Sequence, residues 1–301
     1  MSILAFADTN ILVQGITGRE ASTFTRESIH YGAHIVAGVT PGKGGQQIHG
    51  VLVFDTVAAA VQARSVQASI IAVPAPIVRD AAFEALESGI ELLVIVSERV
   101  PRKDVVAILE SASVKGTRVI GPNSLGVISP ERTRIGMCGG AARDTRRAYM
   151  KGSVGIMSRS GGMMTELASQ LTQTGIGQST CISVGGDPIV GSTFADLLPL
   201  FEADEETKAL LLFCEPGSTM EERLVDRLRE QPSRLPIVAF IAGRFADRMQ
   251  GIRFGHAGAI VEGQRGSPAG KAGKLEAAGV RVASRLSQIP EYVREVVPEP
   301  A

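Results

Sequence analysis

The sequence predicts an α/β protein with two doubly wound, largely parallel sheets, on the basis of its length and one recurring pattern. The chain has 301 residues, which suits two compact domains of about 150 residues each. Short β-branched apolar runs alternate with stretches of helical length and spacing. This alternation lapses once, over residues 130–151, and restarts at residue 152. We therefore predict a first domain over residues 1–129, a junction over 130–151 and a second domain over 152–301.

The first domain is expected to contain five strands joined by helices. The strands are predicted at residues 11–13, 34–36, 70–73, 92–96 and 118–120. The helices are predicted at residues 21–31, 57–64, 77–88 and 102–113. Because each helix leads from one strand to the next, the strands are expected to run parallel.

The second domain repeats this rhythm after the junction. Residues 130–151 hold five arginines and a Gly-Gly pair and have no usable periodicity. Strands are then predicted at residues 154–157, 180–184, 209–214, 237–241 and 280–282, and helices at 165–172, 194–202, 220–230, 274–278 and 289–296. The pattern indicates a second α/β domain.

Charge and cysteine content exclude several classes of function. The chain has 31 basic and 31 acidic residues, so it lacks the positive excess that binding to nucleic acid or an anionic membrane requires. Cys138, Cys181 and Cys214 are an odd number, widely spaced and without a C-x-x-C pair, so we expect reduced buried thiols rather than disulfides or a zinc site. No metal, nucleic acid or membrane partner is expected.

The N-terminal segment is typical of a first strand rather than a signal peptide. Its first fifteen residues are apolar, but no Lys or Arg precedes Arg19, and they run directly into a glycine-rich turn. No apolar run reaches the length of a membrane span. We expect a cytoplasmic protein, or the mature form of an imported one.

A glycine-rich turn and a lysine follow the first two predicted strands. The turn spans residues 15–21, where small residues let backbone amides approach a phosphate at a helix N-terminus. An NAD site needs an acidic residue at the end of the second strand, but this strand leads into Lys43. A lysine suits a ligand with an additional phosphate, either NADP or coenzyme A. Each segment alone is also compatible with a plain turn and a solvated lysine.

His256 lies in a glycine-rich stretch that leaves its ring nitrogens approachable. The stretch reads Phe254-Gly255-His256-Ala257-Gly258-Ala259. A neutral imidazole can carry a phosphoryl group on one nitrogen while the other is held. An exposed loop histidine is the simpler interpretation. No role is assigned to His30, His34 or His49.

The second domain contains a possible partner and an anion cradle for this imidazole. Glu215 ends an apolar strand, where its carboxylate could accept the second ring N–H and fix the tautomer. Residues 158–162, Ser-Arg-Ser-Gly-Gly, follow a strand and open a helix, so their amides and the helix dipole could hold an anion. An ordinary strand-end acid and a helix cap remain the simpler alternatives.

Several strings occur in the order and spacing of one family. They are residues 15–18 (GITG), 39–45 (VTPGKGG), 73–76 (VPAP), 120–123 (IGPN), 158–162 (SRSGG), 185–188 (GGDP), 191–194 (GSTF) and 255–260 (GHAGAI). Jointly they resemble the alpha subunits of succinyl-CoA synthetases over nearly the whole chain. The resemblance implies a Rossmann-like CoA-binding domain followed by a flavodoxin-like ligase domain. One departure is Ala21, where the family usually has glycine.

The resemblance also implies roles for individual residues. The residues expected to bind CoA are Thr17, Gly18, Arg19, Glu20, Pro41, Lys43, Val96, Ser97, Glu98 and Asn123. His256 would be phosphorylated, Glu215 would support it, and Ser158, Ser160, Gly161 and Gly162 would hold the phosphate. The implied reaction forms an acyl-CoA reversibly through an acyl phosphate and a phosphohistidine.

A partner subunit is expected because the chain has no G-x-x-x-x-G-K-[ST] loop. In the family, ATP or GTP and its Mg²⁺ bind to an ATP-grasp beta subunit, in an αβ or α2β2 assembly. The phosphohistidine loop would then travel between two sites.

The identity of the acid substrate is left open by the sequence. Thr165 stands where succinate-specific relatives commonly have a substrate-side tyrosine, and Ser-Arg-Ser-Gly-Gly-Met resembles the citrate-using relatives, ATP-citrate lyase and citryl-CoA synthetase. Succinate, malate, citrate and other small carboxylates are therefore candidates. An NADP-binding oxidoreductase and a non-catalytic acyl-CoA-binding regulator remain the rival interpretations.

Overall fold

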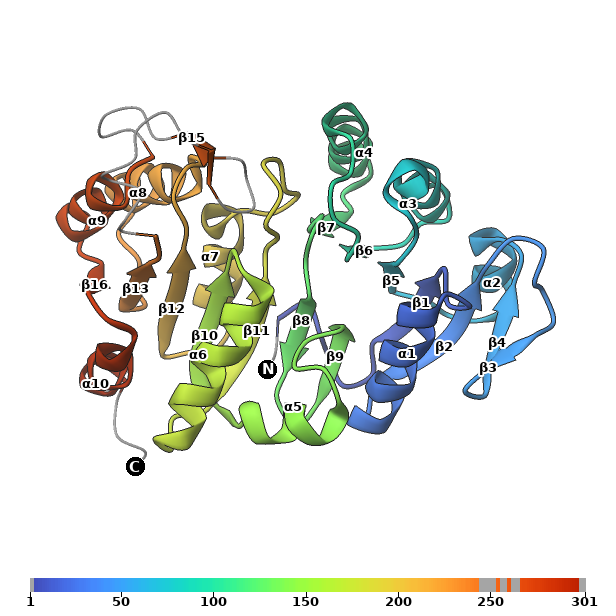
Figure 1. The fold of residues 1–301 in the computed structure, drawn as a ribbon, viewed down its shortest axis with the longest axis horizontal. Helices are drawn as coiled ribbons and strands as arrows, with labels where there is room; N and C mark the ends of the chain where they lie inside the picture. The colour runs from blue at the N-terminus through green and yellow to red at the C-terminus, as the bar shows by residue number, and fades with distance from the viewer. Residues whose placement is uncertain (1–2, 244–252, 255–258, 261–265, 298–301) are drawn as a thin grey trace.

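Two seven-stranded sheets lie side by side in the protein (Figure 1). The structure is a computed structural model, and it describes residues 3–243, 253–254, 259–260 and 266–297. No helix in these described ranges is both long and apolar enough to cross a membrane. The mixed α/β architecture with two doubly wound sheets confirms the predicted fold class.

The first sheet has the strand order β3-β4-β2-β1-β5-β6-β7. Six of its strands are parallel, namely β1 (Asn10–Gln14), β2 (His34–Val39), β4 (Val51–Phe54), β5 (Ala68–Ile71), β6 (Leu92–Ile95) and β7 (Arg118–Ile120). Strand β3 (Gln47–Ile48) pairs antiparallel at the edge. The order reverses at β1, which has β2 on one side and β5 on the other. Ligands of doubly wound sheets bind at such a reversal, beyond the carboxyl ends of the strands.

Helices connect the strands of the first sheet and cover it. They are α1 (Arg19–Tyr31), α2 (Val57–Ala63), the short 3-10 helix η1 (Ala75–Ile77), α3 (Val78–Glu87) and α4 (Arg102–Lys115). All the predicted strands and helices of this half are present, with ends that differ by a few residues. The small hairpin of β3 and β4 was not predicted, because its short strands carry little periodic signal.

The second sheet has the order β16-β13-β12-β10-β11-β8-β9. Its parallel strands are β10 (Lys151–Ser158), β11 (Gln178–Ser183), β12 (Ala209–Cys214), β13 (Ile237–Ile241) and β16 (Arg281–Ala283), and the antiparallel β8 (Gly126–Ser129) and β9 (Thr133–Gly136) complete one edge. A separate hairpin pairs β14 (Arg253–Phe254) with β15 (Ala259–Ile260). The order reverses at β10.

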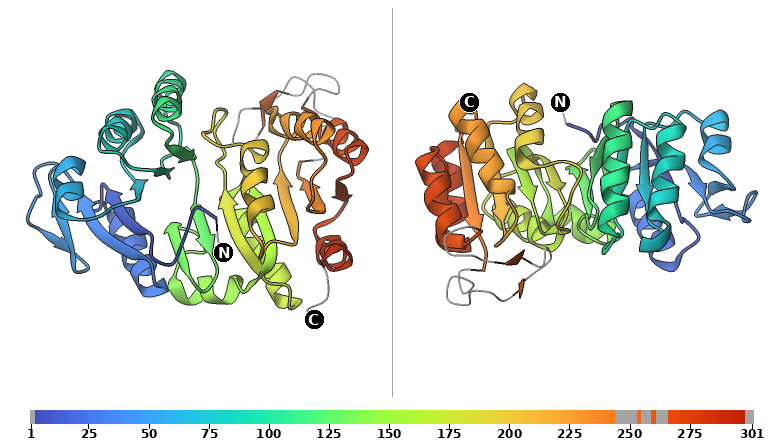
Figure 2. Two further views of the ribbon diagram at one scale, coloured as in Figure 1. Left: turned by 180° about the vertical axis from the view of Figure 1, so that it is seen from behind. Right: turned by 90° about the horizontal axis from the view of Figure 1, so that it is seen from above.

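Helices on opposite faces cover this second sheet (Figure 2). They are α5 (Ala142–Ala148), α6 (Gly161–Gln173), α7 (Phe194–Ala203), α8 (Met220–Glu230), α9 (Pro268–Ala277), η3 (Leu286–Gln288) and α10 (Ile289–Val296). Helix α6 packs against α5 and α10, whereas α7 packs against α8 and α8 against α9. The predicted elements of this half are also present.

The segment over residues 130–151 is more regular than predicted. It contains β9 and α5, and β8 and β9 both join the second sheet. The sequence predicted neither element, because β9 has four residues with a buried arginine among them and α5 has seven residues that are mostly polar. The limits of the two domains stay a prediction.

Arg134 of β9 is fully buried and connects the two parts of the molecule. Its Nε donates to Ser28 Oγ of α1 at 3.0 Å, and its Nη1 donates to the carbonyl oxygens of Cys138 and Gly140 and to Thr145 Oγ1 of α5, at 2.7–2.9 Å. Burial lowers the pKa of this guanidinium. These hydrogen bonds offset part of the cost of burying the charge and connect α1 with α5, although Nη2 is buried and has no hydrogen-bond partner in the described part of the chain.

The three cysteines are free and buried. Burial raises the pKa of the Cys138 thiol to about 12 and also raises the pKa values of Cys181 and Cys214. All three are therefore neutral thiols at neutral pH, and they contribute to the core as small apolar groups.

A bidentate ion pair leads to a prediction about acid stability. Arg132 donates to both carboxylate oxygens of Glu206, at 2.8 and 2.7 Å, which lowers the pKa of Glu206 from 4.5 to about 2. Such a group contributes stability above its unfolded pKa, and this contribution is lost as the pH falls through the folded pKa. We expect Glu206→Gln to lower the free energy of unfolding at pH 7 by at most about 1 kcal/mol, since the pair is partly exposed.

Urea unfolding measured between pH 7 and pH 2 checks this prediction. The difference between wild type and Glu206→Gln should shrink from about pH 5 downward. Glu205→Gln, at the exposed neighbouring position, serves as the control and should leave the pH dependence unchanged. Parallel pH profiles for wild type and Glu206→Gln would contradict the assignment.

Candidate functional site

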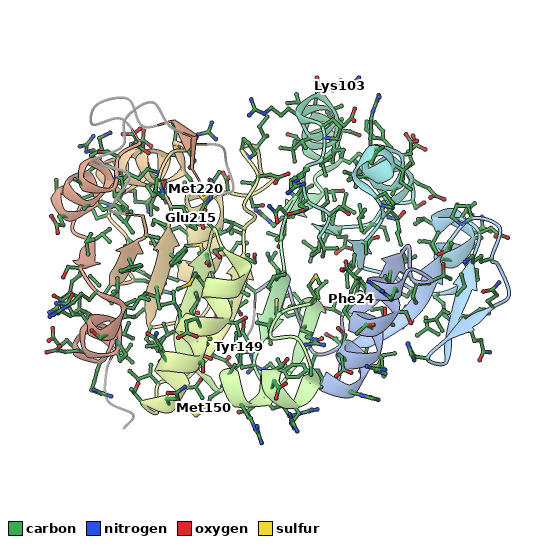
Figure 3. All side chains as sticks on the ribbon, viewed as in Figure 1. Phe24, Lys103, Tyr149, Met150, Glu215 and Met220 are labelled. Atoms are coloured by element: carbon green, nitrogen blue, oxygen red, sulfur yellow. The ribbon has the colours of Figure 1, made fainter. Side chains whose placement is uncertain are left out.

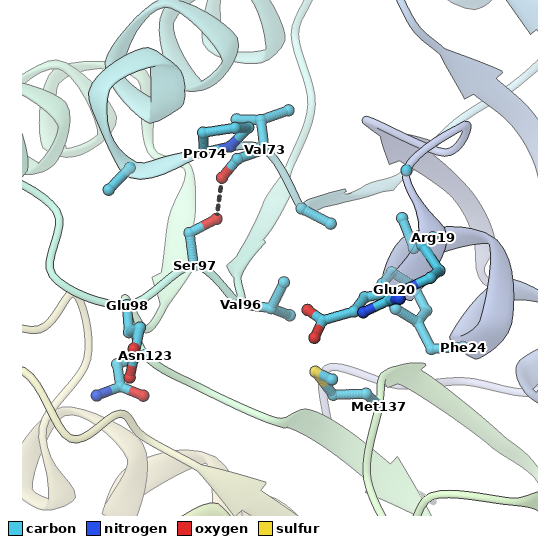
Figure 4. Close-up of a pocket in the computed structure, with 14 residues that line it drawn as sticks. Arg19, Glu20, Phe24, Val73, Pro74, Val96, Ser97, Glu98, Asn123 and Met137 are labelled. Atoms are coloured by element: carbon cyan, nitrogen blue, oxygen red, sulfur yellow. Dashed lines mark hydrogen bonds between the residues drawn. The ribbon is translucent and has the colours of Figure 1, made fainter.

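A cavity of about 710 Å³ opens at the carboxyl ends of β1, β5 and β6 (Figure 4). It lies at the strand-order reversal of the first sheet, where doubly wound folds bind ligands. Seven of the ten residues predicted to bind CoA line it, namely Gly18, Arg19, Glu20, Val96, Ser97, Glu98 and Asn123. The first sheet therefore brings together residues that are about 100 positions apart in the chain.

The turn between β1 and α1 requires glycine at its start. Gly15 has a φ of +79°, and a Cβ atom there would lie 2.5 Å from the carbonyl oxygen of Ala72. The Gly15 amide donates to Val39 O at 2.8 Å, and Gly18 donates back to Gly15 O at 2.9 Å. Gly18 is the N-cap of α1 and provides no side-chain cap. The amides of the first helical turn are therefore suited to hold a phosphate.

Hydrogen bonds fix the far wall of this cavity. The Ser97 hydroxyl donates to Val73 O, and the Asn123 amide donates to Ser97 O at 2.9 Å. Asn123 has a φ of +57°, a left-handed conformation that asparagine tolerates better than most residues. Its Nδ2 donates to Asp187 Oδ1 at 3.1 Å. Asn123 thus joins the cavity to the loop after β11 in the second sheet.

Several lining residues were not assigned a role from the sequence. Phe24, Val73, Pro74 and Met137 contribute apolar surface to the cavity. Figure 4 shows Glu20 of α1 facing Val96, with Met137 nearby. The sequence could have indicated Phe24 by the apolar face of α1 and Val73 by its position at the end of a strand. Met137 follows β9, which was not predicted, so no sequence pattern indicated it.

Thr17, Pro41 and Lys43 are not among the residues that line this cavity. Lys43 is exposed in the neighbouring turn after β2, and its amide donates to Thr40 O at 3.1 Å. The Thr17 hydroxyl lies 3.3 Å from the Thr40 hydroxyl and so connects this turn to the one at α1. Lys43 thus lies beside the turn that precedes α1, and its contact with CoA remains a proposal.

The N-terminus of α6 forms the second predicted site. The Ser158 hydroxyl donates to Ser160 O at 2.6 Å and accepts the Ser160 amide at 3.1 Å, and the Ser160 hydroxyl caps the Met163 amide at 3.4 Å. These bonds shape a tight turn between β10 and the helix. Gly162 is exposed and a Cβ atom there would meet nothing within 4 Å, so an anion can approach the helix end.

Glu215 is brought to the same edge of the second sheet. It follows β12, which pairs with β10 so that Ser158 lies opposite Phe213, and the Arg159 amide donates to Phe213 O at 3.2 Å. Glu215 is half-buried beyond the end of its strand (Figure 3). His256, the predicted phosphate carrier, lies outside the described residues.

Lys271 of α9 holds the turn that carries Glu215, a role that the sequence did not indicate. It is 1% exposed, its Nζ donates to Glu215 O at 3.1 Å and to Gly217 O, and it forms an ion pair with Glu221. These contacts connect α8, α9 and the Glu215 turn. A lysine that contacts residues about 50 positions away leaves no local sequence signal.

Thr165 lies one turn into α6, and its hydroxyl is 2.9 Å from the hydroxyl of Tyr149. Tyr149 is buried between α5 and β10, and burial raises its pKa, so the phenol is neutral at neutral pH. The structure places the threonine hydroxyl in this pair, and its predicted contact with the acid substrate remains a proposal.

Among the described residues there is no group of three or more His, Cys, Asp or Glu side chains that could hold a metal ion. The candidate site comprises the N-termini of α1 beside the first sheet and α6 beside the second, and the Asn123–Asp187 hydrogen bond connects loops near them. Burial raises the pKa of Asp187, and its hydrogen bond from Asn123 partly opposes this effect.

Comparison with known proteins agrees with this geometry. A family model for CoA-binding domains matches residues 6–99, and a second, for CoA-ligases, matches residues 157–285. The alpha subunit of the ADP-forming succinate–CoA ligase of Methanothermobacter thermautotrophicus is 46% identical, over 97% of this chain and 96% of the relative. Alpha subunit 1 of the ADP-forming succinate–CoA ligase of Archaeoglobus fulgidus is 43% identical, over 99% of each chain.

Other relatives carry different substrate names. A subunit of an ADP-forming sulfoacetate–CoA ligase from Acholeplasma is 39% identical, over 98% of each chain. Among solved structures, the ATP citrate lyase of Methanosaeta concilii superposes with a TM-score of 0.91 at 22% identity. This match covers 98% of the present chain and 50% of the lyase chain, so the chain corresponds to half of that protein. At this identity the likeness concerns the fold alone.

The two matched domains define a subunit of a carboxylate–CoA ligase. Within that class, the chain belongs to the family of succinate–CoA ligase alpha subunits, as the full-length relatives show. The assignment supports neither the NADP-dependent oxidoreductase nor the non-catalytic regulator that the sequence had left open.

Two neighbouring glycines give a matched test of the turn at α6. A Cβ atom on Gly161 would lie 2.2 Å from Leu125 Cγ, whereas one on Gly162 would meet nothing within 4 Å. We expect Gly161→Ala to lower the free energy of unfolding by about 1–3 kcal/mol through overpacking. Gly162→Ala should be neutral or slightly stabilising, because alanine is the better helix former. Urea unfolding of both variants measures this, and equal stabilities would contradict the close packing.

The buried ion pair of Lys271 gives a second prediction. We expect Lys271→Met to lower the free energy of unfolding by about 3–5 kcal/mol, since it leaves the buried Glu221 carboxylate uncompensated. Lys274→Met, one turn along the same helix, removes a partly exposed pair with Glu222 and should cost less than about 1 kcal/mol.

The double variant Lys271→Met/Glu221→Leu separates the effect of the unpaired carboxylate from the effect of altered packing. It should recover part of the stability measured by urea unfolding, since an apolar pair can replace a buried ion pair. Similar decreases in the free energy of unfolding for Lys271→Met and Lys274→Met would show that the buried pair stabilises the fold no more than the second pair does.

Proposed function

We propose that this chain binds CoA in the 710 Å³ cavity and carries phosphate on His256 for a beta subunit that binds the nucleotide. The observation that carries the proposal is the arrangement of two phosphate-compatible helix ends, at α1 and at α6, in one chain of this family. The hydrogen bond between Asn123 and Asp187 connects the loops beside these two sites. In this proposal, the backbone amides of Thr17–Glu20 and the Lys43 ammonium hold the phosphates of CoA, and Ser97 and Asn123 lie beside its thiol arm.

The proposed reaction proceeds through two phosphorylated intermediates. The terminal phosphoryl group of ATP or GTP moves to a ring nitrogen of His256, and the nucleoside diphosphate leaves. A carboxylate oxygen of the acid substrate attacks phosphorus, which frees the imidazole and forms an acyl phosphate. The CoA sulfur then attacks the acyl carbon, releasing inorganic phosphate and the thiol proton as the thioester forms.

The residues of the second sheet are suited to the phosphohistidine stage. The Glu215 carboxylate can accept the N–H of the ring nitrogen that does not carry phosphate, which fixes the tautomer. The amides at Gly161 and Gly162 can stabilise the phosphate at the positive end of α6. Lys271 positions Glu215 by holding the carbonyl groups of its turn.

We propose a small di- or tricarboxylate as the acid substrate. The relatives include succinate–CoA ligases and a sulfoacetate–CoA ligase, so the family accepts acids with a second anionic group. In this proposal a bulkier acid lies beside Thr165, which is smaller than the tyrosine that succinate-specific relatives commonly have. An ATP-grasp beta subunit is the proposed partner because the sequence has no phosphate-binding loop of the G-x-x-x-x-G-K-[ST] type.

Labelling with ATP tests the proposed phosphate carrier. The chain, its beta subunit and ATP labelled at the γ-phosphate should give acid-labile, base-stable label on the alpha chain. The label should disappear in His256→Ala and persist in His34→Ala, which changes an exposed histidine at the start of β2. Label that persists in His256→Ala would overturn the assignment, and acyl-CoA synthesis by the chain without its partner would overturn the proposed division of labour.

The proposed role of Lys43 is tested with CoA that lacks its 3′-phosphate. Wild type should bind CoA about tenfold more tightly than dephospho-CoA, which reflects one charge-assisted contact. Lys43→Ala should bind both at the weaker affinity, and Lys103→Ala, which removes an exposed lysine of α4, should retain the preference. Isothermal titration of the αβ complex measures these affinities. An undiminished preference in Lys43→Ala would remove Lys43 from the site.

A further inference from the structure

A second, smaller cavity lies on the opposite face of the second sheet from α6. It has a volume of about 140 Å³ and is lined by residues from the ends of β10 and β11 and from the N-termini of α7 and α8, including Arg159, Thr193, Thr219 and Arg223. Figures 1 and 2 show α7 and α6 on different faces of this sheet. The cavity is therefore separate from the predicted phosphate turn at Ser160–Gly162.

Arg159 is the buried cation of this cavity. Its side chain is 2% exposed, and its Nη2 donates to the carbonyl oxygens of Gly186 and Asp187, each at 3.3 Å. Its Nε is buried and has no hydrogen-bond partner within the described part of the chain. An unpaired buried donor is costly and rare in folded proteins, so a buried guanidinium beside a cavity indicates a missing acceptor.

The other walls add positive potential. Helices α7 and α8 have 10 and 11 residues and both begin here, at Phe194 and Met220, so both dipoles place their positive ends at the cavity. Thr219 begins α8 without a side-chain cap. Arg223 lies one turn further along α8 and is exposed.

The acidic groups of these two helix ends are already engaged. Asp196 accepts the Thr193 amide and hydroxyl, at 2.8 and 2.7 Å. Glu221 Oε2 forms an ion pair with Lys271, and Glu222 Oε1 lies 3.4 Å from Lys274 Nζ. The second oxygen of each carboxylate is buried and has no hydrogen-bond partner in the described part of the chain. The side chain of Asp187 accepts a hydrogen bond from Asn123. Two arginines and two helix ends therefore face the cavity, and each nearby carboxylate has a partner other than these arginines.

We propose that this cavity is a binding site for one small oxyanion, of the phosphate or carboxylate class. Its 140 Å³ is well below the roughly 300 Å³ at which drug-sized ligand pockets begin, which excludes a nucleotide. The Nε of Arg159 provides the buried donor, the first turn of α8 provides amides, and Arg223 closes the site from the solvent side. None of the described residues proposed to transfer phosphate lines this cavity.

A crystallographic experiment locates the anion directly. Crystals of the αβ complex are soaked in selenate, a tetrahedral oxyanion with a strong anomalous signal. The proposal expects a selenate within hydrogen-bond distance of Arg159 Nε. Selenate found only at the N-terminus of α6, or only at surface lysines, would overturn it.

Solution binding identifies the source of the anion. Phosphate and citrate are titrated separately against the αβ complex, and binding is followed by the rise in Tm. Arg223→Ala should lower the affinity for the anion that binds here about tenfold. Arg229→Ala, which removes an exposed arginine on the same helix, should leave this affinity unchanged. If Arg223→Ala weakens the binding of phosphate, the cavity is a site for free phosphate. If it weakens the binding of citrate alone, the cavity is a site for a substrate carboxylate. No dependence on Arg223 for either anion would overturn the proposal, and it would leave labelling of His256 unaffected.

Discussion

The hydrogen bonds of Asn123 connect the 710 Å³ cavity with the loop that follows β11. Its backbone amide reaches Ser97 O in the first sheet, and its side chain reaches Asp187 beyond the second sheet. Both sheets are doubly wound, so each gathers its chemically active loops at the carboxyl ends of its strands. The two edges must then be held in register for a ligand bound at one to reach a group at the other. The left-handed backbone of Asn123 allows a single residue to make both contacts.

Local patterns in the sequence predicted the strands and helices because they depend on hydrophobic periodicity. The Gly15–Gly18 turn was also predictable, since only glycine fits the approach to Ala72. Seven residues that the family resemblance assigned to CoA line one cavity, because a parallel sheet brings successive strand ends together. The assignments of individual contacts remain predictions, and His256 lies outside the described residues.

Buried charged residues account for most of what the sequence did not reveal. Arg134 lies in a strand where an apolar side chain would be expected, and its partners are spread over α1, α5 and the intervening turn. Lys271 and Glu221 are 50 positions apart, and each alone is indistinguishable from a solvated surface residue. Arg159 stands within a string that was identified for its glycines and serines. Long-range pairing cannot be inferred from a local pattern, so these residues required the three-dimensional structure.

The close packing of Leu125 on Gly161 has a consequence for interpreting variants of this protein. Leu125 lies two residues after Asn123, so one short segment touches both the 710 Å³ cavity and the turn that opens α6. A substitution that displaces this segment changes the walls of both pockets at once. If the proposed roles of the two pockets hold, its kinetic effects would combine altered thioester formation with altered phosphoryl transfer. A change in one Michaelis constant would then not identify the altered pocket.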